Sequence, residues 1–261
     1  MWEKILTKID ELHSLDKQNQ VFGAALHKYK CNPRLSPVDL QIIENRLGVT
    51  LPTQLRSFYL EIGNGGVGPH YGLSPAENVT NYRAAIDYPG IDAFKTDVKT
   101  DPENLNGNCI EVDHDELTGL IAVIQEGCGH EICLIASGPK AGNIVTISCD
   151  DLLYESEITL IDVYQHWLDS EIEVFQFVKE LLGSEMTLTE IADAVRERFG
   201  RHDTRDIVVS IIDSKKPKAL FGSGNHRIYH GATQLPWYES EFQKYKRAQK
   251  LPGKSWWKLG N

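Results

Sequence analysis

The sequence lacks several features that define whole classes of protein. It has no run of about 18 apolar residues, so no helix is expected to span a bilayer. Its first residues lack the basic-then-apolar layout of a secretory signal. The five cysteines among 261 residues make an odd number, and their spacings match no disulfide framework. We therefore expect a cytoplasmic protein whose cysteines are free and mostly buried.

The common catalytic motifs are missing as well. No Gly-x-Ser-x-Gly sequence is present to carry a nucleophilic serine. The glycine run Gly63–Gly68 lacks the Gly-Lys-Ser/Thr ending of a phosphate-binding loop, and it follows a predicted helix instead of preceding one. His114 lies among acidic residues, which is typical of a solvated turn. With no visible arrangement of nucleophile, base and oxyanion donors, we predict that the protein is not an enzyme.

One cluster of metal-binding residue types, Cys128, His130 and Cys133, is present. A structural zinc site needs about four ligands, usually supplied by two such clusters. Cys109, Cys149 or His114 would complete a site only if folding brought them close. We favour a turn followed by an inward-facing apolar Cys133, and predict neither a metal nor a cofactor.

Charge is unevenly distributed along the chain. Residues 1–183 contain 13 Lys and Arg against 28 Asp and Glu, a net charge of −15, whereas residues 184–261 contain 14 against 9, a net charge of +5. An acidic body of this size repels nucleic acid and anionic membranes and attracts basic proteins. Solubility alone is an equally good explanation of the acidity.

The N-terminal third is predicted to be helical. Residues 1–20 have apolar residues at 3- and 4-residue spacing, as in an amphipathic helix. Ser36-Pro37 starts a second helix that Gly48 ends, and Leu51-Pro52 starts a third that ends at Gly63. Together these short helices predict a compact helical corner.

The middle of the chain is predicted to form strands. Apolar or alternating runs at 109–113, 119–124, 132–136 and 143–147 are joined by short turns, which favours an antiparallel meander. A long helix follows over about 159–182. Helices packed around such a sheet make an α+β fold. In the remainder, we expect a helix at 189–199 and a strand at 206–213.

The order of these segments resembles the SMI1/KNR4 or SUKH superfamily. The matching features are a helix–Leu-Pro–helix corner, a glycine run, a Gly-Cys-Gly hairpin, a Gly-Pro turn and a final helix with an aromatic pair. They lie at Leu35–Gly48, Leu51–Tyr59, Gly63–Gly66, Gly72-Leu73, Gly127–Glu131, Gly138-Pro139 and Tyr164 with Trp167-Leu168. The resemblance covers roughly residues 30–180.

The resemblance implies a non-catalytic α+β binding domain. Many bacterial members are similar to immunity proteins that bind a polymorphic toxin domain, often a nuclease; eukaryotic relatives act as scaffolds or regulators. We accordingly expect an N-terminal helix at 1–29, an SMI1/KNR4-like domain at 30–183 and a small basic C-terminal extension or subdomain at 184–261.

The expected partner is a basic toxin domain. From exposure and charge, we predict that its contacts come from the glycine-rich segment and from acidic loops, with no role for a membrane. The predicted contact residues are Asn64, His70, Tyr71, Asp113, Asp115, Glu116, Glu126, Asp150, Asp151 and Glu155.

The basic C-terminal segment supports an alternative function. Its lysines and arginines interleave with aromatic residues, a composition that suits single-stranded nucleic acid through phosphate contacts and base stacking. The alternative is therefore a nucleic-acid-associated or regulatory scaffold protein; we favour a segment whose aromatics fill a small core or cover the acidic body. The residues concerned are Lys244, Tyr245, Lys246, Arg247, Lys250, Lys254, Trp256, Trp257 and Lys258.

Overall fold

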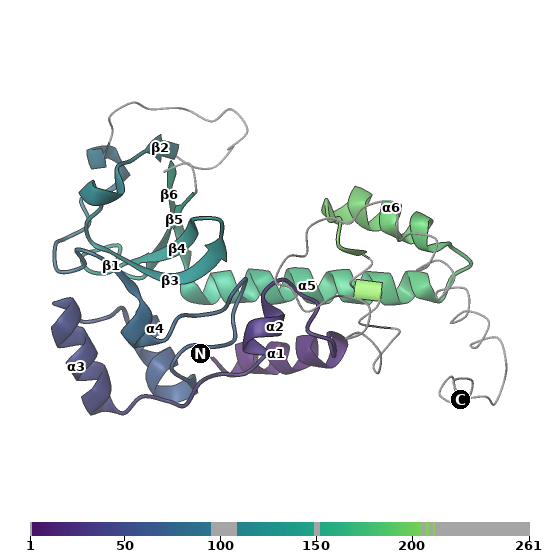
Figure 1. Ribbon diagram of the computed structural model, residues 1–261, viewed down its shortest axis with the longest axis horizontal. Helices are drawn as coiled ribbons and strands as arrows, with labels where there is room; N and C mark the ends of the chain where they lie inside the picture. The colour runs from purple at the N-terminus through teal and green to yellow at the C-terminus, as the bar shows by residue number, and fades with distance from the viewer. Residues whose placement is uncertain (1, 95–108, 149–151, 205–206, 209–210, 212–261) are drawn as a thin grey trace. The chain divides into compact units, whose positions relative to one another are not determined.

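The computed structural model describes residues 2–94, 109–148, 152–204, 207–208 and 211 (Figure 1). The chain divides into two compact units. The first consists of residues 1–11 and 22–169, and the second of residues 12–21 and 170–261. Within the described residues, no helix combines the length and apolarity needed to cross a membrane.

Helix α3 (Pro37–Leu47) forms where the sequence predicts it. Ser36 accepts a hydrogen bond from the Asp39 N–H, Pro37 occupies the first turn, and Gly48 ends the helix with a φ of +74°. Both ends are thus satisfied by local groups. The buried stripe consists of Leu40, Ile43 and Leu47.

Buried Glu44 fixes the corner between α3 and the next helix. Helix α4 (Thr53–Ser57) continues as a π-helical turn, Phe58–Ile62. One carboxylate oxygen of Glu44 accepts a 2.7 Å hydrogen bond from the Leu51 N–H, and the other pairs with Arg56. Because Glu44 is only 3% exposed, these contacts are needed to offset its desolvation.

The helical part of the first unit packs around Tyr164, which lies on α5 (Leu160–Leu182). Its ring centroid lies 5.6 Å from that of Trp2, at the start of α1 (Glu3–Leu15), and 5.8 Å from that of Phe58. The Tyr164 hydroxyl donates a 2.7 Å hydrogen bond to the Val67 carbonyl. Helix, helical corner and glycine-rich segment therefore meet at one buried aromatic cluster.

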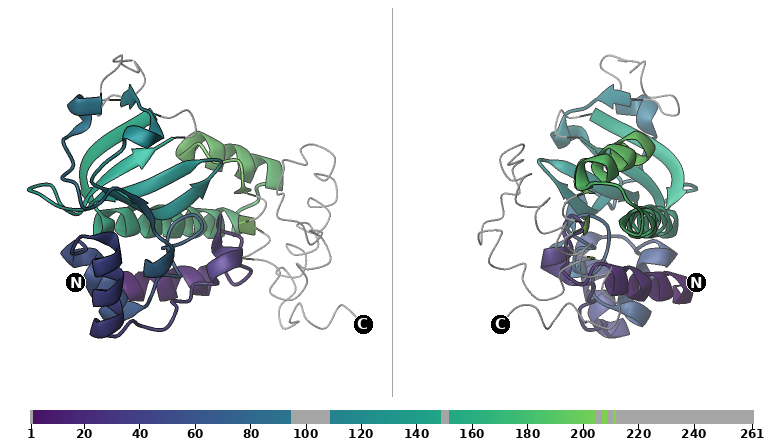
Figure 2. Two further views of the ribbon diagram at one scale, coloured as in Figure 1. Left: turned by 60° about the vertical axis from the view of Figure 1, so that its left-hand side comes forward. Right: turned by 90° about the vertical axis from the view of Figure 1, so that its right-hand side faces the viewer.

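Six strands form one antiparallel sheet, in the order β1-β3-β4-β5-β6-β2 (Figures 1 and 2). Strands β3, β4 and β5 are successive neighbours, which confirms this part of the predicted meander. The predicted first strand of the meander, β2, instead pairs with β6 at the far edge of the sheet. The sequence pattern predicted neither β1 nor β6. The strands are β1 (Thr80–Tyr82), β2 (Cys109–Glu111), β3 (Leu120–Gly127), β4 (His130–Ile135), β5 (Asn143–Ile147) and β6 (Leu152–Thr159).

Both faces of the central strands are buried. On one face, side chains of β3 to β6 form a core with residues of the irregular segments that precede β3, among them Phe94 and Leu117. The N-terminal helices of this unit lie on the other side of the sheet (Figures 1 and 2). Double coverage explains the continuous apolar run at the start of β3, where five successive residues are buried. The confirmed class is therefore α+β.

The second unit contains α6 (Leu188–Phe199), close to its predicted bounds. Thr187 and Glu190 form a reciprocal capping box at its start, and Gly200 ends it in the left-handed region. The predicted strand at 206–213 is wrong at Ile207, Val208 and Ile211, which are helical. Short runs of β-branched residues do not distinguish a strand from a buried helical turn, and Ile207 and Val208 are indeed buried.

Candidate protein-binding surface

The glycine-rich connector, Gly63–Pro75, is folded tightly against β3. Gly66 and Leu73 exchange backbone hydrogen bonds of 2.8 and 3.0 Å, and Leu73 also forms a bridge to Ile124 of β3. Gly72 has a φ of +87°, and a methyl group there would lie 2.0 Å from the Gly66 carbonyl oxygen. Glycine is required because no side chain fits between these two backbone segments.

Asn64, at the start of the connector, points inward. It is 8% exposed, its Oδ1 accepts a 2.8 Å hydrogen bond from the Ala76 N–H, and its Nδ2 donates to Glu77 at 2.8 Å. These contacts tie the start of the connector to the segment before β1. Asn64 is therefore engaged within the fold and is not part of the candidate surface.

His70 and Tyr71, at the other end of the connector, reach the surface together. The Tyr71 N–H donates to the Gln125 carbonyl at 3.3 Å. Tyr71 is 42% exposed, and its ring lies 5.2 Å from that of Phe22, which is 49% exposed. The Phe22 ring also lies 5.9 Å from the His70 imidazole. Phe22 was not among the predicted contact residues, because its segment shows no regular sequence pattern.

Glu126 completes this group. Its Oε1 lies 2.7 Å from His70 Nε2. The hydrogen bond from His70 holds the pKa of Glu126 below its ordinary value against the opposing effect of burial, and the nearby His130 contributes in the same direction. Three predicted contact residues thus meet with one that was not predicted. We call Phe22, His70, Tyr71 and Glu126 the aromatic patch.

Three other predicted residues form an acidic turn, defined as Asp113, Asp115 and Glu116. All three are exposed. Asp113 caps the short 3-10 helix His114–Glu116, and its Oδ1 accepts a 2.9 Å hydrogen bond from the Asp115 N–H. The carboxylates of Asp115 and Glu116 are left at the surface, where they contribute to the field around the protein.

The acidic turn and the aromatic patch lie at opposite ends of β3. The His114 ring lies 6.1 Å from that of Tyr82, whose register partner Leu120 begins β3. At the other end, the Cβ position of Gly127 is 3.1 Å from the Tyr71 ring. Eight strand residues separate the ends by roughly 23 Å, at about 3.3 Å per residue. The predicted contacts therefore form two groups and not one.

Glu155 is engaged within the fold. Its carboxylate accepts hydrogen bonds of 3.1 Å from both the Tyr88 hydroxyl and the Ile91 N–H, and it pairs with Lys140. Burial raises the pKa of Glu155, but the hydrogen bonds from Lys140, Ile91 and Tyr88 outweigh it and lower the pKa below its ordinary value. Glu155 positions the segment before η3 (Ile91–Phe94) against β6 and is also omitted from the surface.

Some predicted residues lie outside the described residues. These are Asp150 and Asp151 of the contact set, Cys149 of the metal alternative, and the basic aromatic residues between Lys244 and Lys258.

The Cys128, His130 and Cys133 cluster is split by the strand. Cys128 is exposed in the hairpin turn with a φ of +53°, whereas Cys133 is fully buried in the core between the sheet and the segments that precede β3. Burial raises the pKa of the Cys133 thiol well above its ordinary value, which opposes formation of a metal-binding thiolate. Among the described residues, no three His, Cys, Asp or Glu side chains are grouped to hold a metal ion.

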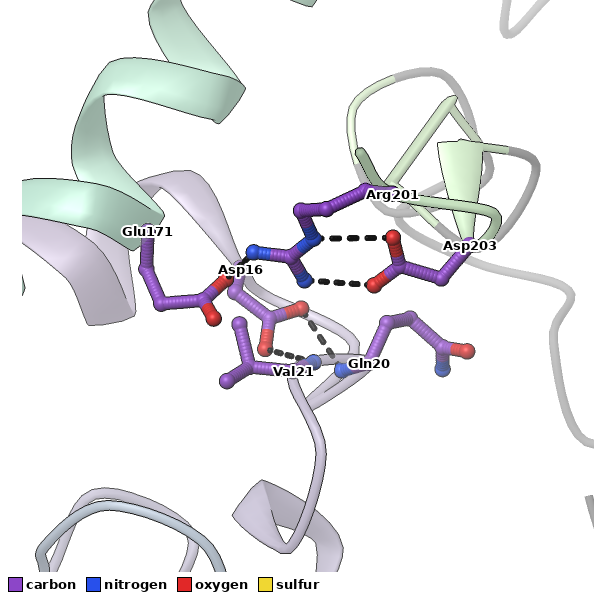
Figure 3. Close-up of polar contacts among 6 residues, drawn as sticks. All are labelled: Asp16, Gln20, Val21, Glu171, Arg201 and Asp203. Carbon is purple, nitrogen blue, oxygen red and sulfur yellow. Dashed lines mark hydrogen bonds and ion pairs between the residues drawn. The ribbon is translucent and has the colours of Figure 1, made fainter. Parts of the chain in front are cut away.

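The second unit contains a charged cluster centred on Arg201 (Figure 3). Its guanidinium binds both oxygens of Asp203, with an Nε–Oδ1 distance of 2.9 Å, and lies 2.7 Å from Glu171. Burial raises the pKa of Glu171, and Arg201 only partly offsets this effect. In the same cluster the Asp16 carboxylate accepts hydrogen bonds from the N–H groups of Gln20 and Val21. Every acidic group here has a structural partner, so we interpret the cluster as part of the fold.

Comparison with known proteins gives one match. The sequence profile described as the SMI1 / KNR4 family (SUKH-1) matches residues 34–169, which is 136 of the 261 residues. No curated protein and no solved structure shows a significant match to the chain. The matched range begins before α3 and ends within α5, so it includes the helical corner, the connector and the whole sheet.

Proposed function

The chain belongs to the SMI1 / KNR4 family (SUKH-1), and we propose that it is a non-enzymatic protein-binding module that neutralises a polymorphic toxin, such as a nuclease, by docking on it. Family membership is the observation that carries this proposal. The first unit adds physical support: it contains 11 Lys and Arg against 24 Asp and Glu, a net charge of −13. Such a charge attracts a basic partner, and nucleases bear basic surfaces because their substrates are anionic.

The proposed mechanism is steering followed by occlusion. The acidic turn attracts the partner at long range, because its carboxylates are exposed and have no basic partner among the described residues. The aromatic patch then buries surface in a contact of standard size, about 1,600 Å² in total. A toxin covered in this way loses access to its substrate without any chemical step by the protein.

The test pairs the purified 261-residue chain with the C-terminal toxic domain of any polymorphic toxin that a neighbouring gene encodes. We expect a 1:1 complex that abolishes the toxic activity, and an association rate that falls as salt is raised from about 50 to 500 mM. Cells expressing the toxic domain should survive only when the chain is co-expressed. Absence of a complex at both salt concentrations would refute the proposal. A complex in which the toxin stays active would refute it as well.

A further inference from the structure

Close backbone contacts hold the segments that carry the aromatic patch. Gly23, next to Phe22, has a φ of +80°. A methyl group at this position would lie 1.6 Å from the His70 carbonyl oxygen, so the backbone beside Phe22 is in direct contact with the connector. The connector is in turn bound to β3 through the Tyr71 N–H. The rings of Phe22 and Tyr71 are thus presented from three fixed backbone segments. A surface of this kind loses little conformational entropy on binding.

Among the described residues of the first unit, no other Phe, Tyr or Trp side chain is exposed, although Tyr82, Tyr88 and Tyr154 are only half-buried. Trp2, Phe58, Tyr59 and Tyr164 are each no more than 2% exposed. Phe22 and Tyr71 are more than 40% exposed and lie in contact with each other. Adjacent exposed aromatics held on a rigid backbone are typical of the anchoring point of an interface.

The chemistry of the patch favours a cation. The faces of Phe and Tyr rings carry negative electrostatic potential and attract Lys and Arg side chains. The His70 ring contacts Phe22 on one side and the Glu126 carboxylate on the other. The lowered pKa of Glu126 keeps this carboxylate ionised at neutral pH. Within the described part of the chain, the Glu126 carboxylate accepts no hydrogen bond other than that from His70. A purely apolar occupant would desolvate this carboxylate with only the hydrogen bond from His70 to compensate.

We propose that the aromatic patch binds an arginine or lysine side chain that projects from the basic protein partner. This inference rests on the proposed function, and it names both the end of β3 that the partner covers and the side chain that anchors it. The acidic unit as a whole, at a net charge of −13, favours the same occupant. The acidic turn at the other end of β3 attracts the partner without forming the anchor.

The first experiment probes the patch without the partner. The full-length chain is titrated with Nα-acetyl-arginine amide, and separately with the uncharged Nα-acetyl-citrulline amide, while the ring signals of Phe22 and Tyr71 are followed by NMR. We expect the arginine compound to shift both signals, and the citrulline compound to shift them much less. Equal shifts with both compounds, or shifts with neither, would overturn the proposal.

The second experiment uses the complex with the toxic domain. Tyr71→Leu keeps much of the apolar area but removes the π face, and it should weaken binding by about 3- to 30-fold, whereas Tyr71→Phe should bind like the wild type. Phe22→Ala should show a loss similar to that of Tyr71→Leu. Ile86→Ala is the matched control, because Ile86 is 52% exposed in the turn next to the first residues of β3.

The outcomes separate the two proposals. If the wild-type chain forms no complex, the proposed function fails, and the arginine titration still decides what the patch binds. If the wild type binds but Tyr71→Leu binds equally well, the anchor is elsewhere and only the present inference fails.

Charge reversal of Lys246 and Arg247 that shifts the patch signals would assign the patch to the chain's own basic segment. Signals that shift with protein concentration alone would assign it to a second copy. Either result overturns the inference.

Discussion

The two ends of the glycine-rich connector differ in where their side chains lie. At its start, Asn64 is 8% exposed, and its side-chain amide forms hydrogen bonds with Ala76 and Glu77. Seven residues later, Tyr71 is 42% exposed and contacts another exposed ring. Tyr71 lies inside the loop that the bridge between Gly66 and Leu73 closes, whereas Asn64 precedes that bridge. Polar composition alone therefore does not identify a contact residue. Substitutions at the start should reduce stability, and substitutions at the far end should reduce binding.

Gly72→Ala should have the largest effect, because it breaks the connector itself. The new methyl group would lie 2.0 Å from the Gly66 carbonyl oxygen, in addition to the cost of the left-handed conformation. We expect a loss of at least about 3 kcal/mol in the free energy of unfolding, measured by urea denaturation. Gly138→Ala is the matched control: its φ of +83° is similar, but nothing lies within 4 Å of its Cβ position. It should cost about 1 kcal/mol. Equal losses would show that the close approach at Gly72 is unimportant.

Asn64→Ala and Tyr71→Ala compare the two ends directly. The Asn64 substitution leaves the buried Ala76 N–H without its acceptor, and we expect a loss of about 2 kcal/mol in unfolding free energy. The Tyr71 substitution removes a half-exposed ring and should cost less than about 1 kcal/mol. Denaturation midpoints of the two variants decide the order. The reverse order would mean that the exposed end of the connector carries the stability.

The parts of the fold that depend on local groups were predictable from sequence. Helix α3 follows from Ser36 at its start and Gly48 at its end, and both groups act within one turn of the helix. Strand β6 was missed because Glu155 and Glu157 interrupt its apolar pattern and its partners β2 and β5 are set by long-range pairing. Strand β1 has only three residues, too few to show a period.

The candidate surface was only partly predictable, for a related reason. Exposure and charge correctly indicated that Tyr71 and the acidic turn lie at the surface. The internal hydrogen bonds of Asn64 and Glu155 come from distant residues, so the sequence gives no signal for them. The exposure of Phe22 depends on the contact between Gly23 and the connector, which is likewise invisible in the sequence.

The contribution of Glu155 to stability is expected to be smaller and to depend on pH. Its pKa in the folded state lies below the ordinary value of 4.5. Its stabilising effect is therefore complete above the unfolded-state pKa and is lost as pH falls through the folded-state value. We expect Glu155→Gln to remove about 1 kcal/mol or less at pH 7, because Lys140 is largely exposed. Below about pH 4, the difference from wild type should shrink.

The control for Glu155 is its partner. Lys140→Met leaves the hydrogen bonds from Tyr88 and Ile91 in place, so it should lose less stability than Glu155→Gln at pH 7. Urea denaturation of both variants at several pH values between 3 and 7 measures the effect. A difference between wild type and Glu155→Gln that stays constant over this range would show that the ionised carboxylate contributes nothing.

The smallest effect on stability is expected for substitutions in the acidic turn. These substitutions distinguish residues that attract the partner from residues that anchor it. Asp115→Asn with Glu116→Gln removes two exposed charges while leaving the Asp113 cap intact, so the unfolding free energy should change by no more than about 0.5 kcal/mol. Exposed charges act mainly on the rate of encounter, whereas desolvated anchors act on dissociation. The double variant should therefore slow association with the toxic domain about 2- to 5-fold at low salt, with no change at high salt. Tyr71→Leu should instead speed dissociation at both salt concentrations. Stopped-flow measurements of both rates distinguish the two, and a faster dissociation of the double variant would place the acidic turn inside the buried interface.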